Sequence, residues 1–195
     1  MEKVDVYLLT GNVGTGKTTT ANKLFAERGI VSLDRDEVRE QLGIGHYDPA
    51  DSARIDEIIW NRLKECVSNG ISVSMGTASA MKLDRRLLYY DKFREISCEL
   101  GKEIQIVLVE CDCDQEEAKK RISMRPAEGS ATSDPEDYDM VASRAIPIGG
   151  QEIGRNDNVS FLRFDTQRSV VEAIAVRDGH RDVVKDLVTV LTTKL

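Results

Sequence analysis

The chain has 195 residues, a formal net charge of −7 at pH 7 and 41% hydrophobic residues, which suit one ordinary globular domain. An acidic chain is not drawn to nucleic acid by its overall field, so such a partner would need a local basic site. The four cysteines show no CxxC spacing, which argues against a zinc site or a disulfide framework. We also find no signal peptide and no apolar run long enough to span a bilayer, so we expect a cytoplasmic protein without membrane contact.

Apolar runs and helical periodicity predict strands and helices that alternate along the chain. In chain order we expect a strand at 4–10, a helix at 18–28, a strand at 30–33, helices at 36–42 and 52–69, a strand at 71–75, a helix at 83–100, a strand at 104–109, helices at 116–124 and 135–144, irregular chain at 147–158, a strand at 160–164 and a helix at 182–192. This order predicts one α/β domain over residues 1–195, with a parallel sheet of about five strands and helices on both faces. Ligands of such sheets bind at the carboxyl ends of the strands.

The loop after the first predicted strand carries the strongest motif. Residues 11–18 match G-x-x-x-x-G-K-(S/T) at every fixed position, between a strand and a helix as that motif requires. Glycines let the backbone N–H groups turn toward phosphates, Lys17 can reach the β- and γ-phosphates, and the Thr18 hydroxyl can bind Mg²⁺. We therefore predict that the chain binds ATP with Mg²⁺, and that Thr18 is the metal ligand. The predicted nucleotide-binding residues are Gly11, Asn12, Val13, Gly14, Thr15, Gly16, Lys17, Thr18 and Thr19.

The segment after the second predicted strand bears on the type of P-loop protein. No (N/T)KxD motif for guanine is present, and residues 34–39 read Asp-Arg-Asp-Glu-Val-Arg. This segment resembles the D-x-x-R signature of polynucleotide 5′-hydroxyl kinases and their zeta-toxin-like and chloramphenicol-phosphotransferase-like relatives. The resemblance implies a P-loop kinase fold in which Asp36 is the base beside the accepting hydroxyl and Arg39 holds the acceptor. The alternative is a solvated, charged helix start, since acids are favoured there.

Basic residues near position 120 resemble the lid of the same kinases. Arg121 and Arg125 are four residues apart on one helical face, ahead of a loop that contains Pro, Gly and Ser. The resemblance implies a lid at about 125–134 whose arginines stabilise charge on the transferring phosphoryl group. The alternative is a basic surface paired with Glu116 and Glu117. Near the start of the helix after the third strand, Arg85 and Arg86 fit either a substrate contact or a plain surface pair.

One position departs from the pattern of these kinases. Relatives place an Asp before a Thr just after the third strand, where this chain has Met75, Gly76 and Thr77. Either that Asp is dispensable, or Mg²⁺ relies on Thr18, phosphate oxygens and water, with Asp34 or Asp36 acting through water.

The leading hypothesis is a kinase that transfers the γ-phosphate of ATP to a hydroxyl of a small nucleoside-like or metabolite acceptor. Two alternatives are a polynucleotide 5′-hydroxyl kinase and a nucleotide-dependent regulatory ATPase or binding protein. Aromatic residues make up 5% of the chain, and its single Trp60 falls on a predicted core-facing helix. Because single-strand binding uses a positive groove and exposed rings, we favour the small acceptor over nucleic acid. No pattern indicates an oligomeric state.

Overall fold

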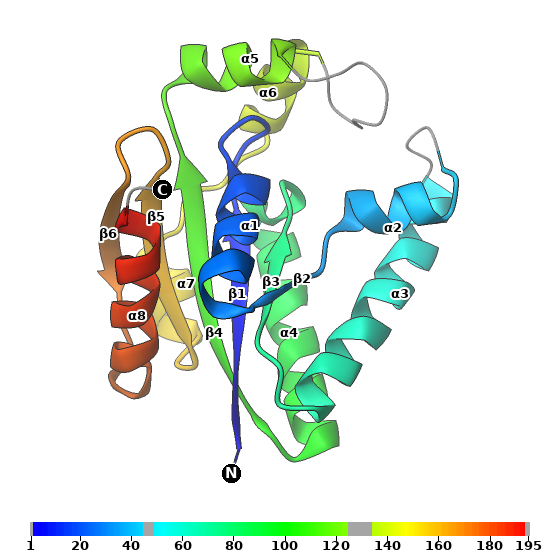
Figure 1. Ribbon diagram of the computed structural model, residues 1–195, viewed down its shortest axis with the longest axis vertical. Helices are drawn as coiled ribbons and strands as arrows, with labels where there is room; N and C mark the ends of the chain where they lie inside the picture. The colour runs from blue at the N-terminus through cyan, green and yellow to red at the C-terminus, as the bar shows by residue number, and fades with distance from the viewer. Residues whose placement is uncertain (1, 45–48, 125–133, 194–195) are drawn as a thin grey trace.

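The computed structural model describes residues 2–44, 49–124 and 134–193, which build a sheet with helices on both faces (Figure 1). The strands are β1 (Lys3–Thr10), β2 (Val31–Ser32), β3 (Val73–Gly76), β4 (Glu103–Asp112), β5 (Val159–Asp165) and β6 (Val170–Ala175). Their spatial order is β2-β3-β1-β4-β5-β6, and neighbouring strands are parallel except for the antiparallel pair β5 and β6. The predicted α/β architecture with five parallel strands is confirmed.

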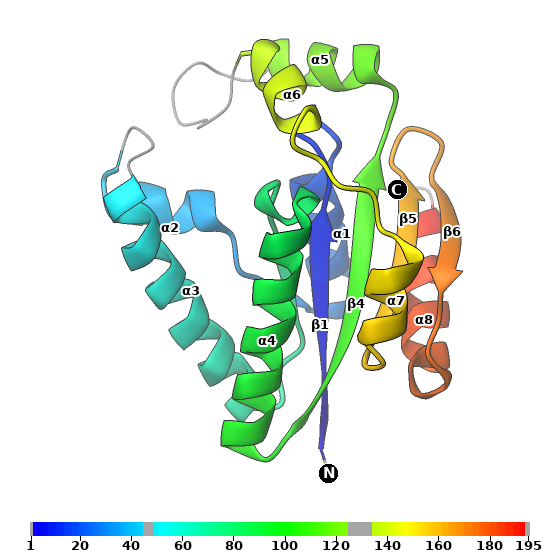
Figure 2. The same ribbon diagram turned by 180° about the vertical axis from the view of Figure 1, so that it is seen from behind.

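The helices divide between the two faces of the sheet (Figures 1 and 2). One face carries α1 (Lys17–Arg28) and α8 (Arg181–Thr192), and the other carries α3 (Pro49–Ser68), α4 (Leu83–Leu100) and α7 (Gly150–Arg155). The shorter helices are α2 (Arg35–Gln41), α5 (Gln115–Ser123) and α6 (Glu136–Ala142), with 3₁₀ turns at Ser79–Met81 and Asp178–His180. No helix among the described residues is long and apolar enough to cross a bilayer.

The alternation of side chains along β1 explains why both faces are covered. Val6 and Leu8 belong to the apolar cluster under α3 and α4, whereas Tyr7 and Leu9 belong to the cluster under α1 and α8. All four side chains are buried. A strand that is apolar on both faces is typical of the centre of a parallel sheet, and β1 lies between β3 and β4.

The structure differs from the sequence-based expectation in three elements. Strand β6 was not predicted, α7 lies within the segment expected to be irregular, and α3 begins at Pro49 rather than Ser52. β6 pairs with β5 alone at the edge of the sheet, and none of its residues is fully buried although five of the six are apolar. Pro49 occupies the first position of α3, where a missing N–H costs nothing.

The carboxyl edge of the sheet gathers the segments that the motifs mark. β1, β3 and β4 run parallel and end at this edge, and α5 and α6 lie beyond it, next to the loop between β1 and α1 (Figures 1 and 2). The fold therefore brings residues 11–19, the start of α2 and α5 to one end of the molecule.

Candidate active site

Three glycines in the loop between β1 and α1 adopt left-handed backbone angles. The φ angle is 139° at Gly11, 80° at Gly14 and 91° at Gly16. A Cβ atom at Gly11 would lie 2.2 Å from the carbonyl oxygen of Cys111, and one at Gly14 would lie 2.4 Å from that of Ala118. Glycine is required at both places because no side chain fits. The loop thus packs tightly on β4 and α5 and leads into α1, whose first N–H groups have no intrahelical acceptors and suit a phosphate.

The Lys17 side chain lies back along this loop. Its ammonium donates to the carbonyl oxygens of Gly11 at 3.0 Å and Asn12 at 2.7 Å. The Thr15 hydroxyl donates to the same Asn12 oxygen at 2.8 Å. Contacts of an ammonium with phosphate are stronger than those with a neutral carbonyl, so an entering phosphate would exchange for these loop oxygens. Binding of a triphosphate by this loop stays a prediction from the motif.

Asn12 connects the loop to α6. Its Nδ2 donates to the carbonyl oxygen of Tyr138 at 3.0 Å, and its Oδ1 accepts the N–H of Val13 at 2.7 Å. Asn12 and Val13 are buried, whereas Thr18 and Thr19 on the first turn of α1 are exposed. Among the predicted nucleotide-binding residues, the two threonines therefore present hydroxyls to solvent, as a metal or phosphate contact requires.

Thr166, which the sequence did not single out, supports the loop from the turn after β5. Its hydroxyl contacts the carbonyl oxygens of Thr15 at 2.9 Å and Asp112 at 3.2 Å, and accepts from Nη1 of Arg121 at 3.0 Å. A Cβ atom at Gly16 would lie 3.2 Å from this hydroxyl oxygen. The contact with Thr15 joins residues 151 positions apart, so no local pattern could have revealed it.

Of the two predicted lid arginines, the structure describes Arg121. Nε of Arg121 donates to Glu117 at 2.8 Å, and Nη1 reaches Thr166, so the guanidinium lies beside the loop while paired on its own helix. The pairing with Glu117 is the one that the surface interpretation expected. A catalytic role for Arg121 stays a prediction. Arg125 and nearly all of the predicted lid at 125–134 lie outside the described residues.

The acceptor motif forms the first turn of α2. Asp34 is the N-cap residue, and its Oδ1 accepts the N–H of Asp36 at 2.8 Å. Burial raises the pKa of Asp34. Asp36 and Arg39 contact each other on one face of the helix, and the Arg35 side chain pairs with Asp56 of α3. The predicted base and acceptor cation therefore lie side by side at the carboxyl end of β2.

Arg86 is buried, so the expectation that it could be a plain surface residue was wrong. Its guanidinium is buried and makes two hydrogen bonds with Glu152 of α7, at 2.7 and 2.8 Å. It also donates to the carbonyl oxygens of Ala80, Met81 and Ile146, each at 3.0 Å. Arg86 thus fastens the segment after α6 to the 3₁₀ turn after β3. Its neighbour Arg85 is exposed.

Cys111 lies near the end of β4, and Cys113 directly follows that strand. Both are buried, and burial raises the pKa of the Cys111 thiol to about 11. Among the described residues, no group of three or more His, Cys, Asp or Glu side chains could hold a metal ion.

Comparison with known proteins places this geometry in a family. The pattern of the AAA domain family matches residues 6–144, a span that includes the glycine loop, α2 and α5. The chain belongs to the AAA domain family. Its curated relatives include the dephospho-CoA kinase of Agrobacterium fabrum, which is 29% identical over 167 residues, covering 71% of this chain and 79% of the relative.

Solved structures with the same layout as this AAA domain protein are described as kinases. A candidate kinase from Chloroflexus aurantiacus is 22% identical with a TM-score of 0.59, and the match covers 85% of this chain and 87% of that one. An unliganded sugar kinase from a Janibacter species is 18% identical with a TM-score of 0.52, covering 82% and 85% of the two chains. The AAA domain protein therefore shares its fold with these kinases.

In this AAA domain protein the residues beside Lys17 offer few ligands for Mg²⁺. Gly76 lies at the end of β3, and the nearest atom to a Cβ built there is the Lys17 Cβ, at 3.9 Å. The position has room for a side chain but carries none. Mg²⁺ prefers oxygen ligands and retains water readily, so the exposed Thr18 hydroxyl together with phosphate oxygens fits such an ion. When bound, Mg²⁺ would offset the negative charge of the phosphates.

A carboxylate at position 76 tests this arrangement. We expect Gly76→Asp to fold and to lower the Mg²⁺ concentration needed for half-maximal binding of a fluorescent ATP analogue by about tenfold, because it adds a charged oxygen ligand. The matched Gly76→Asn, which has similar size and no charge, should shift the midpoint much less. Equal Mg²⁺ midpoints for Gly76→Asp and the unaltered protein would show that position 76 does not face the ion.

Proposed function

We propose that the protein is an ATP-dependent phosphotransferase that moves the γ-phosphate to a hydroxyl of a small molecule. The observation that carries the proposal is the Asp36–Arg39 pair at the carboxyl end of β2, on the same edge of the sheet as the glycine loop. A protein that only binds or hydrolyses ATP needs the loop but has no use for an acceptor base and cation beside it.

The proposed roles follow from exposure and charge. The Arg39 side chain is 13% exposed and therefore well anchored, whereas the Asp36 side chain is 64% exposed and can meet an incoming hydroxyl. Asp36 would orient that hydroxyl and accept its proton, while the oxygen bonds to the γ-phosphorus and the bond to the β-phosphate oxygen breaks. Arg39 would share its charge between Asp36 and an anionic group of the acceptor.

The surroundings of the acceptor motif favour a small molecule over a polynucleotide. Arg35 is neutralised by Asp56 and Arg39 by Asp36, so these cations do not form a continuous positive groove. Among the aromatic side chains of the described residues, the one with large exposure is Phe25, on the outer side of α1. Stacking platforms and positive grooves are what single strands require. The likeness to a dephospho-CoA kinase also supports a metabolite-sized acceptor.

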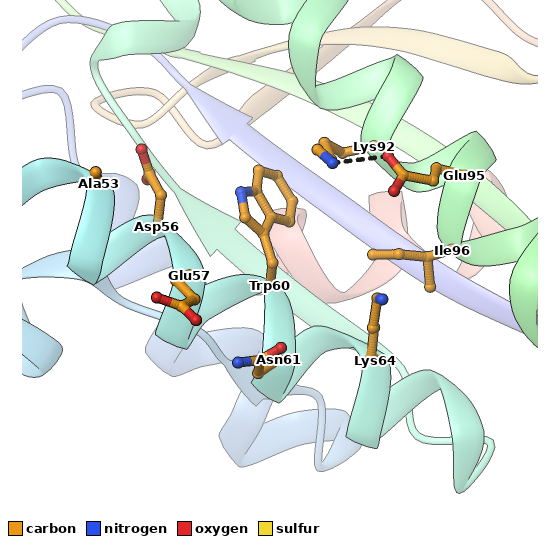
Figure 3. A pocket seen from close by; sticks show the side chains of 9 residues that line it. All are labelled: Ala53, Asp56, Glu57, Trp60, Asn61, Lys64, Lys92, Glu95 and Ile96. Carbon is orange, nitrogen blue, oxygen red and sulfur yellow. Dashed lines mark hydrogen bonds and ion pairs between the residues drawn. The ribbon is translucent and has the colours of Figure 1, made fainter.

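A groove between α3 and α4 does not alter this conclusion (Figure 3). It has a volume of about 420 Å³ and carries charges of both signs, including Asp56, Lys64 and Lys92. Trp60 lies at its centre, and its ring packs 5.3 Å from that of Tyr89, which holds it against the helix pair. Lys92 is nine residues into α4, about 13 Å along the axis from the carboxyl edge of the sheet. The Lys92 end of the groove is therefore remote from the carboxyl edge, whereas its other end adjoins the acceptor motif, because Asp56 pairs with Arg35.

A nucleotide-dependent regulatory protein is the second candidate, and Gly76 is the feature that favours it. A γ-phosphate transfer screen separates the two functions. The acceptors should include dephospho-CoA, neutral sugars, nucleosides and 5′-hydroxyl oligonucleotides, each with labelled ATP. We expect label on one of the small molecules. Transfer to oligonucleotides alone would favour a polynucleotide kinase, and ATP binding without transfer to any acceptor would favour the regulatory protein.

Replacement of the proposed base gives a sharper test once an acceptor is known. We expect Asp36→Asn to lower kcat for transfer by about a hundredfold with little change in ATP affinity, because the hydroxyl loses its proton acceptor. Asp34→Asn is the matched control, since asparagine also caps helices and keeps the acceptor of the Asp36 N–H. Near-normal transfer by Asp36→Asn, or an equal loss in Asp34→Asn, would contradict the assignment.

A further inference from the structure

A second cavity lies next to Thr10, the residue that precedes the glycine loop, on the face of the sheet that α4 and α7 cover. Its volume is about 330 Å³, within the range of small-ligand sites. The polar residues that line it are Thr10, Arg86, Glu110 and Arg163, and its apolar wall includes Met81, Ile146 and Pro147. It is thus walled by the 3₁₀ turn after β3 and by the segment between α6 and α7.

Three of these polar residues, Thr10, Glu110 and Arg163, form one row across the ends of three strands. Thr10 of β1 is in register with Glu110 of β4, which is in register with Arg163 of β5. Nε of Arg163 donates to Oε2 of Glu110 at 3.0 Å. Thr10 lies two residues beyond Leu8 and so points to the same face, which α4 and α7 cover. The row therefore gives the cavity a polar side, called its floor below, which faces the apolar wall.

The Thr10 hydroxyl makes no hydrogen bond to a described residue. Its side chain is 2% exposed, and its Oγ1 has no hydrogen-bond partner among the described residues. Leaving a buried hydroxyl unpaired is costly, and native proteins rarely do so without a water or a ligand nearby. A single water takes about 30 Å³, so satisfying Thr10 with water would use only a small part of the cavity.

The charges around the cavity are already balanced. The five N–H donors of Arg86 all have acceptors, in Glu152 and in the carbonyl oxygens of Ala80, Met81 and Ile146. Arg163 is paired with Glu110, and its Nη1 also lies 3.5 Å from Oε2 of Glu172. A charged ligand would lose its hydration without gaining an uncompensated opposite charge, so the cavity disfavours ions.

The remaining groups define a ligand by its chemistry. Oε1 of Glu110 and Nη2 of Arg163 make no hydrogen bond to a described residue, so the floor offers an acceptor, a donor and the Thr10 hydroxyl, which can be either. Hydroxyl groups satisfy all three, and the carbon skeleton between them can pack on Met81 and Ile146. We propose that this cavity binds a small uncharged polyhydroxylated molecule, a sugar or a polyol.

This site is distinct from the proposed acceptor site. Strands β3 and β1 lie between β2, which leads to Asp36, and β4, which carries Glu110. With about 4.8 Å between adjacent strands, the two sites are about 14 Å apart across the sheet. A molecule of one sugar ring in the cavity could not present its hydroxyl to Asp36.

Ligand-observed NMR with named probes tests the proposal. We expect saturation transfer from the protein to myo-inositol, D-xylose or D-sorbitol at about 10 mM, as for a Kd near 1 mM, and weaker or no transfer to anionic D-gluconate or to cyclohexanol. The signal should persist in the presence of a saturating ATP analogue and in Arg39→Met. Thr10→Val should weaken binding about tenfold, the value of one neutral hydrogen bond.

The structure supplies a matched control for Thr10→Val. The Ser74 hydroxyl is also buried without a partner among the described residues, but Ser74 does not line the cavity. Both Thr10→Val and Ser74→Ala should fold normally, because each removes an unsatisfied group, and only Thr10→Val should weaken polyol binding. Absence of transfer to every neutral probe, equal binding in both variants, displacement by the ATP analogue, or stronger binding of D-gluconate would each overturn the proposal. Because Arg39→Met removes the proposed acceptor contact, its loss of binding would place the polyol at the acceptor site instead.

Discussion

Lys17→Ala is expected to lower nucleotide turnover by about a thousandfold, or about 4 kcal/mol of transition-state stabilisation. The Lys17 ammonium lies within the glycine loop, where it donates to the carbonyl oxygens of Gly11 and Asn12. Its removal should therefore affect phosphate binding far more than folding. The measurements are ATP hydrolysis or transfer, ATP affinity by calorimetry, and thermal unfolding.

Lys23→Ala is the control for this prediction. Lys23 lies on the same helix, and its ammonium donates to the carbonyl oxygen of Leu191 at 3.2 Å, away from the loop. We expect its turnover to stay within about twofold of the unaltered protein. A folded Lys17→Ala that keeps normal turnover, or a Lys23→Ala that loses as much, would show that the glycine loop is not the phosphate site.

Breaking the buried ion pair should give the largest loss of stability. Arg86→Met leaves the Glu152 carboxylate buried with only the Tyr90 hydroxyl, 3.0 Å away, and the expected cost is about 3–5 kcal/mol. For a chain of this size that corresponds to a decrease in Tm of about 10–15 °C. Burial beside Glu152 already raises the pKa of the Tyr90 hydroxyl, so Tyr90 remains a neutral donor and cannot replace the guanidinium.

The double variant separates loss of charge balance from loss of packing. Arg86→Met with Glu152→Met removes both charges, and we expect it to recover part of the lost stability. Recovery should be incomplete because the carbonyl oxygens of Ala80 and Ile146 lose their donor. Arg181→Met, which breaks the exposed pair with Asp178, should cost less than about 1 kcal/mol. A double variant less stable than Arg86→Met would contradict this account.

Local sequence patterns were sufficient for the phosphate loop and the layout of the domain. A P-loop is a contiguous segment whose glycines must adopt left-handed angles, and Gly11, Gly14 and Gly16 do so. Each inner strand is buried on both faces and therefore reads as an apolar run, which made β1 and β4 recognisable. β6 was not predicted although five of its six residues are apolar, because a short apolar run does not by itself distinguish a strand from a helix.

The α2 segment shows which features of the site a sequence motif can predict. The sequence placed Asp36 and Arg39 at the start of a helix, and the structure has both there, in contact with each other. The structure also gives Asp34 a role that the motif did not specify, as the N-cap residue of that helix. A cap contacts only the first turn of its helix. Which of the two nearby acids, Asp34 or Asp36, becomes the cap depends on the backbone angles at the helix start.

Contacts between distant segments were decided by the tertiary structure alone. Arg86 and Glu152 are 66 residues apart, and Thr166 meets Thr15 across 151 residues. An arginine on a helix reads as a surface residue because charge is rarely buried, and only the arrival of Glu152 on α7 makes its burial favourable. The pairing of Thr10 with Glu110 was also decided by the tertiary structure, because local sequence specifies a strand while packing selects its neighbours.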